Sequence, residues 1–384
     1  MRLMAIPATS GGEAAVADFI RSELEKVGAT PSAFSVDRAQ RRTPIQGDTG
    51  NLAYKVPGSL RGPRRMLMAH MDTVPICLGS QPVRRGRMVH SANPKSGLGA
   101  DDRAGVAVTL FVARELQRLA APHPPLTFLW TIQEENGLQG VRLVRLGMLG
   151  KPSLAFNWDG GAAHKLTIGA TGGYRMEIEI RGLASHAGGA PDKGISAISI
   201  ASVAIADLHQ NGWHGLIHKH GKAGTSNVGI IHGGDATNVV TDQVVVKAEA
   251  RSHDPKFRQR IVREIEQAFR RAVKLVRNAQ GKRGSVKFSG QLDYEAFFLD
   301  RSEPCVQVAA AALESLGQEP DLAITNGGLD ANWMFAHGIP TVTLGCGQLN
   351  QHTVSEALDL HMFENACRVA WHLATATESK PDAT

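Results

Sequence analysis

The chain has 384 residues, more than one ordinary hydrophobic core holds, so we expect two domains or one domain with a large insertion. Hydrophobic residues make up 42% and charged residues 20%, which excludes a disordered chain. The N-terminus lacks an apolar core followed by a cleavage site, and no apolar run approaches the length of a membrane span. We therefore expect a cytoplasmic protein with no membrane partner.

The net charge of +6 raises the question of nucleic-acid binding. The densest basic tract is RQRIVREIEQAFRRAVKLVRNAQGKRG, residues 258–284, and its apolar residues recur at helical spacing: Ile261, Ile265, Phe269, Val273 and Val276. This spacing predicts an amphipathic helix with its Arg and Lys side chains on the solvent side. Aromatic residues that could stack on bases do not interleave with these charges. We expect no nucleic-acid partner.

The first 160 residues alternate between helix and strand patterns. In chain order, the sequence predicts a helix at 12–27, a strand at 65–70, a helix at 103–119 and a strand at 126–132. This alternation is typical of an α/β fold with a mixed, largely parallel sheet. Ligand sites in such sheets lie at the carboxyl ends of the strands.

From about residue 172 the pattern changes. It predicts strands at 172–182, 224–234, 243–252 and 285–291, with helices at 195–210 and over the basic tract. The order βαββαβ is that of a ferredoxin-like α+β unit. We therefore expect a catalytic domain in two parts, residues 1–171 and 292–384, separated by an inserted domain at 172–291.

The predicted strand at 65–70 ends in an unusual pair of residues. His70 and Asp72 are two positions apart, so in an extended chain their side chains point to the same face. This spacing suits a metal ligand and a carboxylate that orients it. Taken alone, such a pair is more often a surface histidine and a turn aspartate.

Four more acidic or histidine clusters follow predicted strands or a glycine-rich turn. They are Asp101 and Asp102 in GLGADDRAG, Glu134 and Glu135 after LTFLWTI, Asp159 in FNWDGG, and His352 in GQLNQHT. Each has an ordinary structural alternative, such as a helix N-cap for the aspartates of GLGADDRAG and a turn residue for that of FNWDGG. Adjacent carboxylates at the mouth of a buried strand repel each other, which favours a functional role for Glu134 and Glu135.

Oxygen and imidazole donors of this kind suit zinc. The candidate ligands are five: His70, Asp101, Glu135, Asp159 and His352. Five donors are one too few for two separate three-ligand sites, but they suffice if one carboxylate bridges two ions. We expect two zinc ions per chain, with cobalt or manganese as possible substitutes.

Two other metal-site patterns are weaker. The segment HQNGWHGLIHKHG, residues 209–221, has four histidines but no carboxylate and no helical i, i+4 repeat. The four cysteines are scattered without a CxxC spacing, so neither a disulfide framework nor a thiolate zinc site is indicated.

The motifs together resemble the co-catalytic zinc hydrolases that include peptidase T, carboxypeptidase G and the succinyl-diaminopimelate desuccinylases. HMDTV, GADDRAG, EENG, DGG, GLASHAGGAPDKGISAI, DATNVVTD, EARSHD, NGGLDAN and the histidine of GQLNQHT occur in that family's order and spacing, nearly end to end. Peptidase T-like members are the most similar. The resemblance implies that Asp101 bridges both ions, that His70 and Asp159 complete one site, and that Glu135 and His352 complete the other.

The resemblance also implies roles for residues around the ions. Asp72 would orient His70, and Glu134 would be the general base that takes a proton from the attacking water and passes it to the leaving amine. The inserted domain would be a lid that also forms a homodimer.

Within that lid, the resemblance casts His186 as an oxyanion contact that commonly reaches the partner subunit's site. Asn238 and Arg251 look like residues that contact the substrate's carbonyl oxygen and carboxylate. Asn326 stands where peptidase T has an arginine, so the chain lacks a cation at that substrate-binding position.

The function that these motifs favour is hydrolysis of an amide bond in small peptides by a di-zinc exopeptidase, of the aminopeptidase or tripeptidase type. The alternative is an amidase or deacylase acting on N-acyl amino acids. A catalytically inactive relative that binds peptide or metal would need neither Asp72 nor Glu134, so their presence argues against it.

Overall fold

The computed structural model describes residues 1–376. The chain forms two compact units, which are described separately. Of the described residues, unit 1 comprises 1–169, 298–325 and 329–376, and unit 2 comprises 170–297 and 326–328. No helix within residues 1–376 is both long enough and apolar enough to cross a bilayer.

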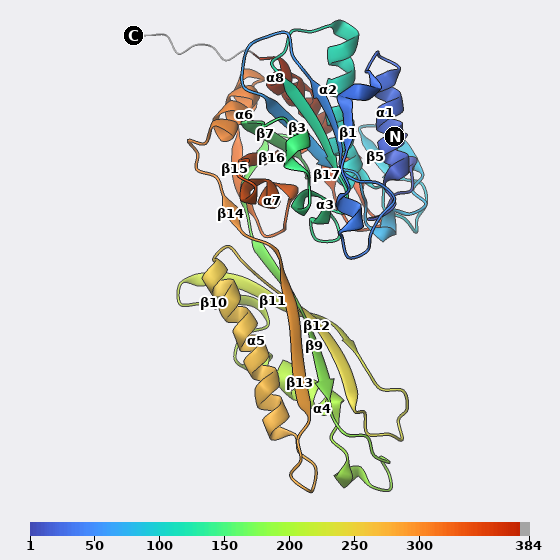
Figure 1. The fold of residues 1–384 in the computed structure, drawn as a ribbon, viewed down its shortest axis with the longest axis vertical. Helices are drawn as coiled ribbons and strands as arrows, with labels where there is room; N and C mark the ends of the chain where they lie inside the picture. Colours follow the sequence, from blue (N-terminus) through green and yellow to red (C-terminus); the bar gives the residue numbers. More distant parts are fainter. Residues whose placement is uncertain (377–384) are drawn as a thin grey trace. The chain divides into compact units, whose positions relative to one another are not determined.

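Unit 1 is built on a nine-stranded mixed sheet in the order β1-β2-β6-β3-β7-β16-β8-β14, with β15 paired to β8 (Figure 1). The strands are β1 (Phe34–Val36), β2 (Leu52–Val56), β3 (Arg65–His70), β6 (Leu126–Thr131), β7 (Leu154–Trp158), β8 (Lys165–Ala170), β14 (Phe297–Phe298), β15 (Asp321–Thr325) and β16 (Thr341–Leu344). A smaller sheet has the order β17-β18-β5-β4, with strands β4 (Pro82–Arg85), β5 (Met88–Ser91), β17 (Gln348–Leu349) and β18 (Ala357–Asp359).

The centre of the large sheet is parallel. Strand β3 pairs in parallel with β6 on one side and β7 on the other, and β7 pairs in parallel with β16. Every residue of these four strands is buried, as expected for parallel strands covered on both faces. Because parallel strands end at the same edge, the segments that follow them are brought together. This architecture confirms the predicted α/β fold class.

The helices of unit 1 are α1 (Ala14–Glu25), α2 (Ala100–Leu119), α3 (Gln139–Arg142), α6 (Pro304–Ser315), α7 (Asp330–Ala336) and α8 (Leu360–Thr375). Helices α2 and α8 pack against each other. The backbone angles of Asp101 and Asp102 are not helical, so the regular part of α2 starts at Arg103, where the sequence predicts it. Asp102 caps this part, because its Oδ1 accepts a hydrogen bond from the N–H of Gly105 at 3.0 Å.

Unit 2 is a five-stranded antiparallel sheet in the order β10-β11-β12-β9-β13, packed against two helices (Figure 1). Its elements are β9 (Gly172–Arg181), α4 (Ala197–Gln210), β10 (Gly215–Lys219), β11 (Lys222–His232), β12 (Gln243–Ser252), α5 (Pro255–Leu275) and β13 (Ser285–Tyr294). Without β10, the order of elements is the predicted βαββαβ. The sequence analysis missed β10, which pairs with the start of β11 at the sheet edge.

The basic tract differs from its prediction in two ways. Helix α5 ends at Leu275, and the following residues turn back at Gly281, whose N–H donates to the carbonyl of Asn278 at 2.9 Å. The predicted solvent side also has an exception, because Arg258 is 2% exposed and binds both carboxylate oxygens of Glu295. Residues Ile261, Ile265 and Phe269 lie in the core as predicted.

Candidate metal centre

The candidate ligands gather at the carboxyl edge of the four parallel strands. His70 is the last residue of β3, Glu135 follows β6, Asp159 follows β7 directly, and His352 lies in the loop between β17 and β18. The N–H of Asp159 donates to the carbonyl of Leu344 at the end of β16, which ties two of these strand ends together. The glycine-rich loop before α2 adds Asp101.

Five residues form two donor groups that share Asp101. In each group, His70, Asp101 and Asp159 or Asp101, Glu135 and His352, the ligand atoms lie within 4.8 Å of one another. His70 Nε2 is 3.2 Å from Asp101 Oδ1, and His352 Nε2 is 3.4 Å from Asp101 Oδ2. The two oxygens of one carboxylate thus face the two histidines, which is the arrangement that a bridging ligand requires.

The charge of this site favours divalent cations. The carboxylates of Asp101, Glu134, Glu135 and Asp159 outnumber the imidazoles beside them in the described residues, which are those of His70 and His352. Burial, followed by repulsion from Asp101, raises the pKa of Asp159 to about 8. The Asp101 and Glu135 carboxylates raise the pKa of His352 to about 10. Asp101 Oδ1 is buried without a well-aligned hydrogen bond in the described residues. Cations bound here would offset the repulsion, so the donor set fits two metal ions.

Asp72 is fully buried beside His70. His70 Nδ1 lies 3.1 Å from the backbone carbonyl oxygen of Asp72 and 3.4 Å from its Oδ1, so Nε2 is left for the metal side of the ring. The same carboxylate accepts hydrogen bonds from the backbone N–H groups of Glu134 and Glu135, at 3.0 and 3.2 Å, and from the hydroxyl of Ser10. Asp72 therefore fixes both a histidine and the loop after β6.

Glu134 is 9% exposed and has its Oε2 4.0 Å from His70 Nε2. Burial and repulsion from Glu135 raise the pKa of Glu134 well above its usual value. A carboxylate with raised proton affinity next to a metal-binding group can accept a proton from water and hold it.

Sequence reasoning missed two buried acids near the site, Glu13 and Asp330. Glu13 accepts the backbone N–H groups of Gly11 and Gln133, and burial followed by repulsion from Asp72 raises its pKa to about 7. Asp330 accepts a hydrogen bond from the hydroxyl of Thr131. Glu13 lies in none of the motifs named above. Asp330 stands in NGGLDAN, but its partner Thr131 is far away in the chain, so the motif alone does not show its contact.

Two further residues missed by sequence reasoning bind the Asp101–Asp102 segment. Glu356 accepts the N–H of Asp101, and the side-chain amide of Gln348 donates to Asp102 Oδ1 at 2.8 Å. Asp102 also accepts the N–H of His70, so its carboxylate is occupied by protein donors.

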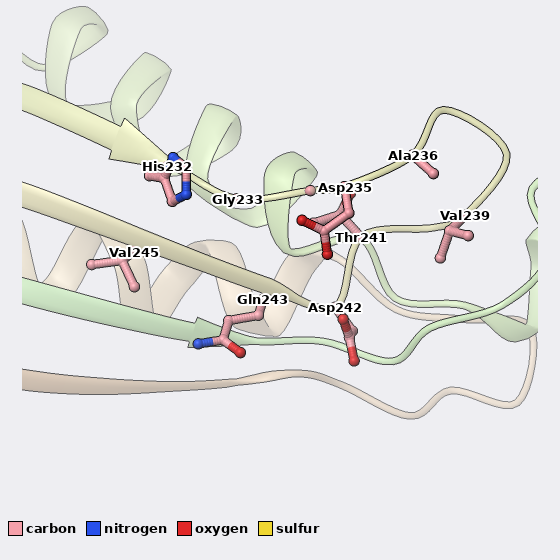
Figure 2. A pocket seen from close by; sticks show the side chains of 10 residues that line it. His232, Gly233, Asp235, Ala236, Val239, Thr241, Asp242, Gln243 and Val245 are labelled. Atoms are coloured by element: carbon pink, nitrogen blue, oxygen red, sulfur yellow. The ribbon is translucent and has the colours of Figure 1, made fainter.

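The remaining candidate residues belong to unit 2. His186 Nδ1 accepts the backbone N–H groups of Gly188 and Gly189, at 3.1 and 2.9 Å. The N–H of Ala187 donates to the carbonyl of Asn238, so these two loops lie side by side. Figure 2 shows a pocket lined by residues from 232 to 245, before and after Asn238 in the chain, with Asp235 and Asp242 among them.

Two more unit 2 residues are already paired within that unit. Arg251, on β12, binds the Glu249 carboxylate through Nε and Nη2, both at 3.0 Å. Asn326 Oδ1 lies 2.9 Å from His253 Nε2.

The histidine-rich segment at 209–221 takes part in neither donor group found in residues 1–376. The rings of His209 and His214 stack with centroids 4.3 Å apart, and His218 lies on β10. The segment is a helix end, a turn and an edge strand.

Comparisons with known proteins find relatives that cover most of this chain. An uncharacterized Bacillus subtilis protein, YqjE, is 31% identical over 81% of this chain and 80% of its own. A solved tripeptidase from Staphylococcus aureus is 26% identical with a TM-score of 0.85, covering 97% of this chain and 95% of its own. The aminopeptidase PepT from Bacillus cereus is 29% identical with a TM-score of 0.80, covering 98% and 96%.

A model of the peptidase family M20/M25/M40 matches residues 66–376, which include all five candidate ligands. The match confirms the family resemblance and the hydrolase class inferred from the motifs. The chain belongs to the peptidase family M20/M25/M40.

Proposed function

We propose that this protein is a dinuclear zinc exopeptidase that hydrolyses an amide bond in small peptides. The observation that carries the proposal is the sharing of Asp101 by two donor groups at one sheet edge. The similarity to a tripeptidase and an aminopeptidase supports a peptide substrate.

In this proposal Asp101 bridges the two ions, His70 and Asp159 hold one, and Glu135 and His352 hold the other. When bound, the ions supply Lewis acidity that polarises the substrate carbonyl and lowers the pKa of water. Zinc is proposed because the set combines imidazole and carboxylate donors, and cobalt or manganese could substitute.

Glu134 would be the general base. It would take a proton from the attacking water and deliver it to the nitrogen of the leaving amine, which makes the departing group neutral. Its burial favours the protonated form between these two transfers. Asp72 would keep His70 in the tautomer that presents Nε2, and it would hold the backbone of Glu134 in place.

Unit 2 would contribute the substrate contacts. Because Nδ1 of His186 accepts two backbone N–H groups, the neutral ring carries its proton on Nε2. That N–H can donate to an oxygen that gains negative charge in the transition state. Asn238 would bind a substrate carbonyl, and Arg251, with its guanidinium fixed by Glu249, would bind a carboxylate. Asn326 would leave the substrate-binding position where peptidase T has an arginine without a cation.

A substrate screen tests the proposal. Zinc-loaded and metal-free protein would be incubated with dipeptides, tripeptides and N-acyl amino acids, and released amines would be measured. Metal-dependent cleavage of peptides is expected. Cleavage of acyl amino acids alone would replace exopeptidase by deacylase, and no cleavage by fully loaded protein would contradict both.

The homodimer and the cytoplasmic location stay predictions.

A further inference from the structure

Glu356 is a buried carboxylate that the proposed mechanism does not use. It is 1% exposed and lies shortly after His352 in the chain. Its Oε1 accepts the backbone N–H of Asp101 at 2.9 Å, and its Oε2 accepts the N–H of Gly99 at 2.7 Å and the thiol of Cys77 at 3.3 Å. One side chain therefore binds the glycine-rich loop at two points, one of them the proposed bridging ligand.

The segments that Glu356 joins each carry a proposed ligand. Asp101 comes from the loop before α2, and His352 from the loop between β17 and β18. The N–H of Glu356 donates to the carbonyl of Thr353 at 3.2 Å, so the turn beside His352 is closed locally. A shift of the Glu356 carboxylate would therefore change the spacing between Asp101 and His352.

The two segments also pack too closely for an added side chain. A Cβ on Gly97 would lie 3.0 Å from Glu356 Oε2 and 2.9 Å from the carbonyl oxygen of Thr353. Real Cβ contacts are almost always longer than this. Glycine at this position lets the backbone approach the carboxylate.

We infer that Glu356 is a positioning residue, which sets Asp101 relative to His352 and thereby controls the affinity of both metal positions. The inference rests on the proposed dinuclear site. The three hydrogen-bond donors are the N–H groups of Asp101 and Gly99 and the thiol of Cys77, and together they use both carboxylate oxygens of Glu356 as acceptors. A glutamine has one acceptor oxygen, so Glu356→Gln would turn an NH₂ group toward the N–H of either Asp101 or Gly99 and lose a hydrogen bond.

The test is zinc affinity, measured by competition with a chelator of known affinity. Glu356→Gln is expected to lower the affinity for both zinc ions by about 10- to 100-fold, the usual effect of losing a partner that orients ligands. Gly97→Ala leaves the Glu356 carboxylate intact but crowds it. This variant should also lower the zinc affinity, by a smaller factor. The matched control is Glu23→Gln, which changes another buried carboxylate of unit 1, 3% exposed, that pairs with Arg2, Lys26 and Arg114. Its zinc affinity should equal that of wild type.

The outcomes separate this inference from the proposed function. Fewer than two zinc ions on the wild-type chain would refute the dinuclear site and the inference with it. Two ions on the wild type with unchanged affinity in folded Glu356→Gln would refute the inference alone, even if that variant unfolds at a lower temperature. If Glu356→Gln does not fold, hydrogen exchange of residues 97–103 in the wild type decides. Equal protection with and without zinc supports positioning by the protein, and rapid exchange without zinc overturns it.

Discussion

The carboxylate of Asp72 lies 3.0 Å from the backbone nitrogen of Glu134. The residue proposed to orient His70, a proposed ligand, thus also holds the backbone of the proposed general base. An extended strand accounts for the first relation, because positions 70 and 72 share a face. The contact between Asp72 and the backbone of Glu134 requires the loop after β6 to fold back onto the end of β3.

Replacing Asp72 by Asn should therefore affect both metal binding and turnover. The amide cannot accept from His70 Nδ1 and from both backbone N–H groups at once, so we expect a loss of about 10- to 100-fold in zinc affinity and a further loss in kcat. Chelator competition and steady-state kinetics would measure the two effects. Ser10→Ala, which removes only the hydroxyl donor to Asp72, is the control and should change both much less. Wild-type zinc affinity in Asp72→Asn would contradict the assignment.

The number of ions is a direct prediction of the shared carboxylate. Elemental analysis of protein saturated with zinc and freed of excess metal should give about two ions per chain. Replacing Asp101 by Asn should lower the affinity of both ions, because that residue belongs to both donor groups. A wild-type content of one ion or fewer would exclude bridging by Asp101.

The Glu134→Gln variant should keep its metals and lose activity. The amide cannot accept a proton from water, so kcat is expected to fall by about 100-fold or more, the scale of general-base catalysis. Zinc content measured on the same sample is the necessary companion. Loss of zinc would instead identify Glu134 as a ligand and would make the assignment of Glu135 wrong.

Glu13 should give the metal-free protein a distinctive pH dependence. Its pKa rises from 4.5 to about 7 on folding, so between these values the folded state binds the proton more tightly than the unfolded state does. The free energy of unfolding therefore loses up to about 3 kcal/mol as the pH rises through this window. Glu13→Gln should be more stable than wild type at pH 8 and similar to it at pH 4.

Urea denaturation of both proteins at several pH values would measure this difference. Glu23→Gln is a control of opposite sign, because a hydrogen bond from Lys26 is the main cause that lowers the pKa of Glu23. That variant should lose stability at neutral pH and little at acid pH. A stability difference between wild type and Glu13→Gln that does not vary with pH would contradict the raised pKa.

Subunit mixing tests the predicted role of His186. If His186 serves the partner's site, His186→Ala and Glu134→Gln chains, each inactive alone, should regain activity after exchange. One site of the mixed dimer would have both residues and the other neither, so about half of the wild-type rate per mixed dimer is expected. Inactivity despite confirmed exchange would mean that His186 acts within its own chain or has no catalytic role.

Much of unit 1 could be predicted because its signals are local. Strand β3 and the regular start of α2 at Arg103 are recovered at their predicted positions, since buried apolar runs and a glycine-rich turn mark them. The convergence of His70, Glu135 and Asp159 follows from parallel strands ending at one edge, whereas His352 comes from the loop between the antiparallel strands β17 and β18 of the smaller sheet.

Other features could not be predicted, for physical reasons. Glu356 and Glu13 matter because they accept backbone N–H groups from distant loops, and every residue has such a donor, so the sequence does not distinguish them. Strand β10 has four of its five residues at least partly exposed, so it lacks the apolar alternation that identifies a strand. The end of α5 at Leu275 depends on a turn held by the Asn278 side chain, which binds the N–H groups of Gln280 and Lys282.

The position of His352 in the chain has a consequence for how the protein matures. His70, Asp101, Glu135 and Asp159 precede all of unit 2, and His352 follows it. During synthesis the ribosome therefore releases four of the proposed ligands well before the fifth. The nascent chain therefore carries one histidine and three carboxylates of the proposed centre long before His352 emerges. Under this assignment, full metal loading waits until the segment after unit 2 has been translated, and products that stop before His352 lack one of the two donor groups.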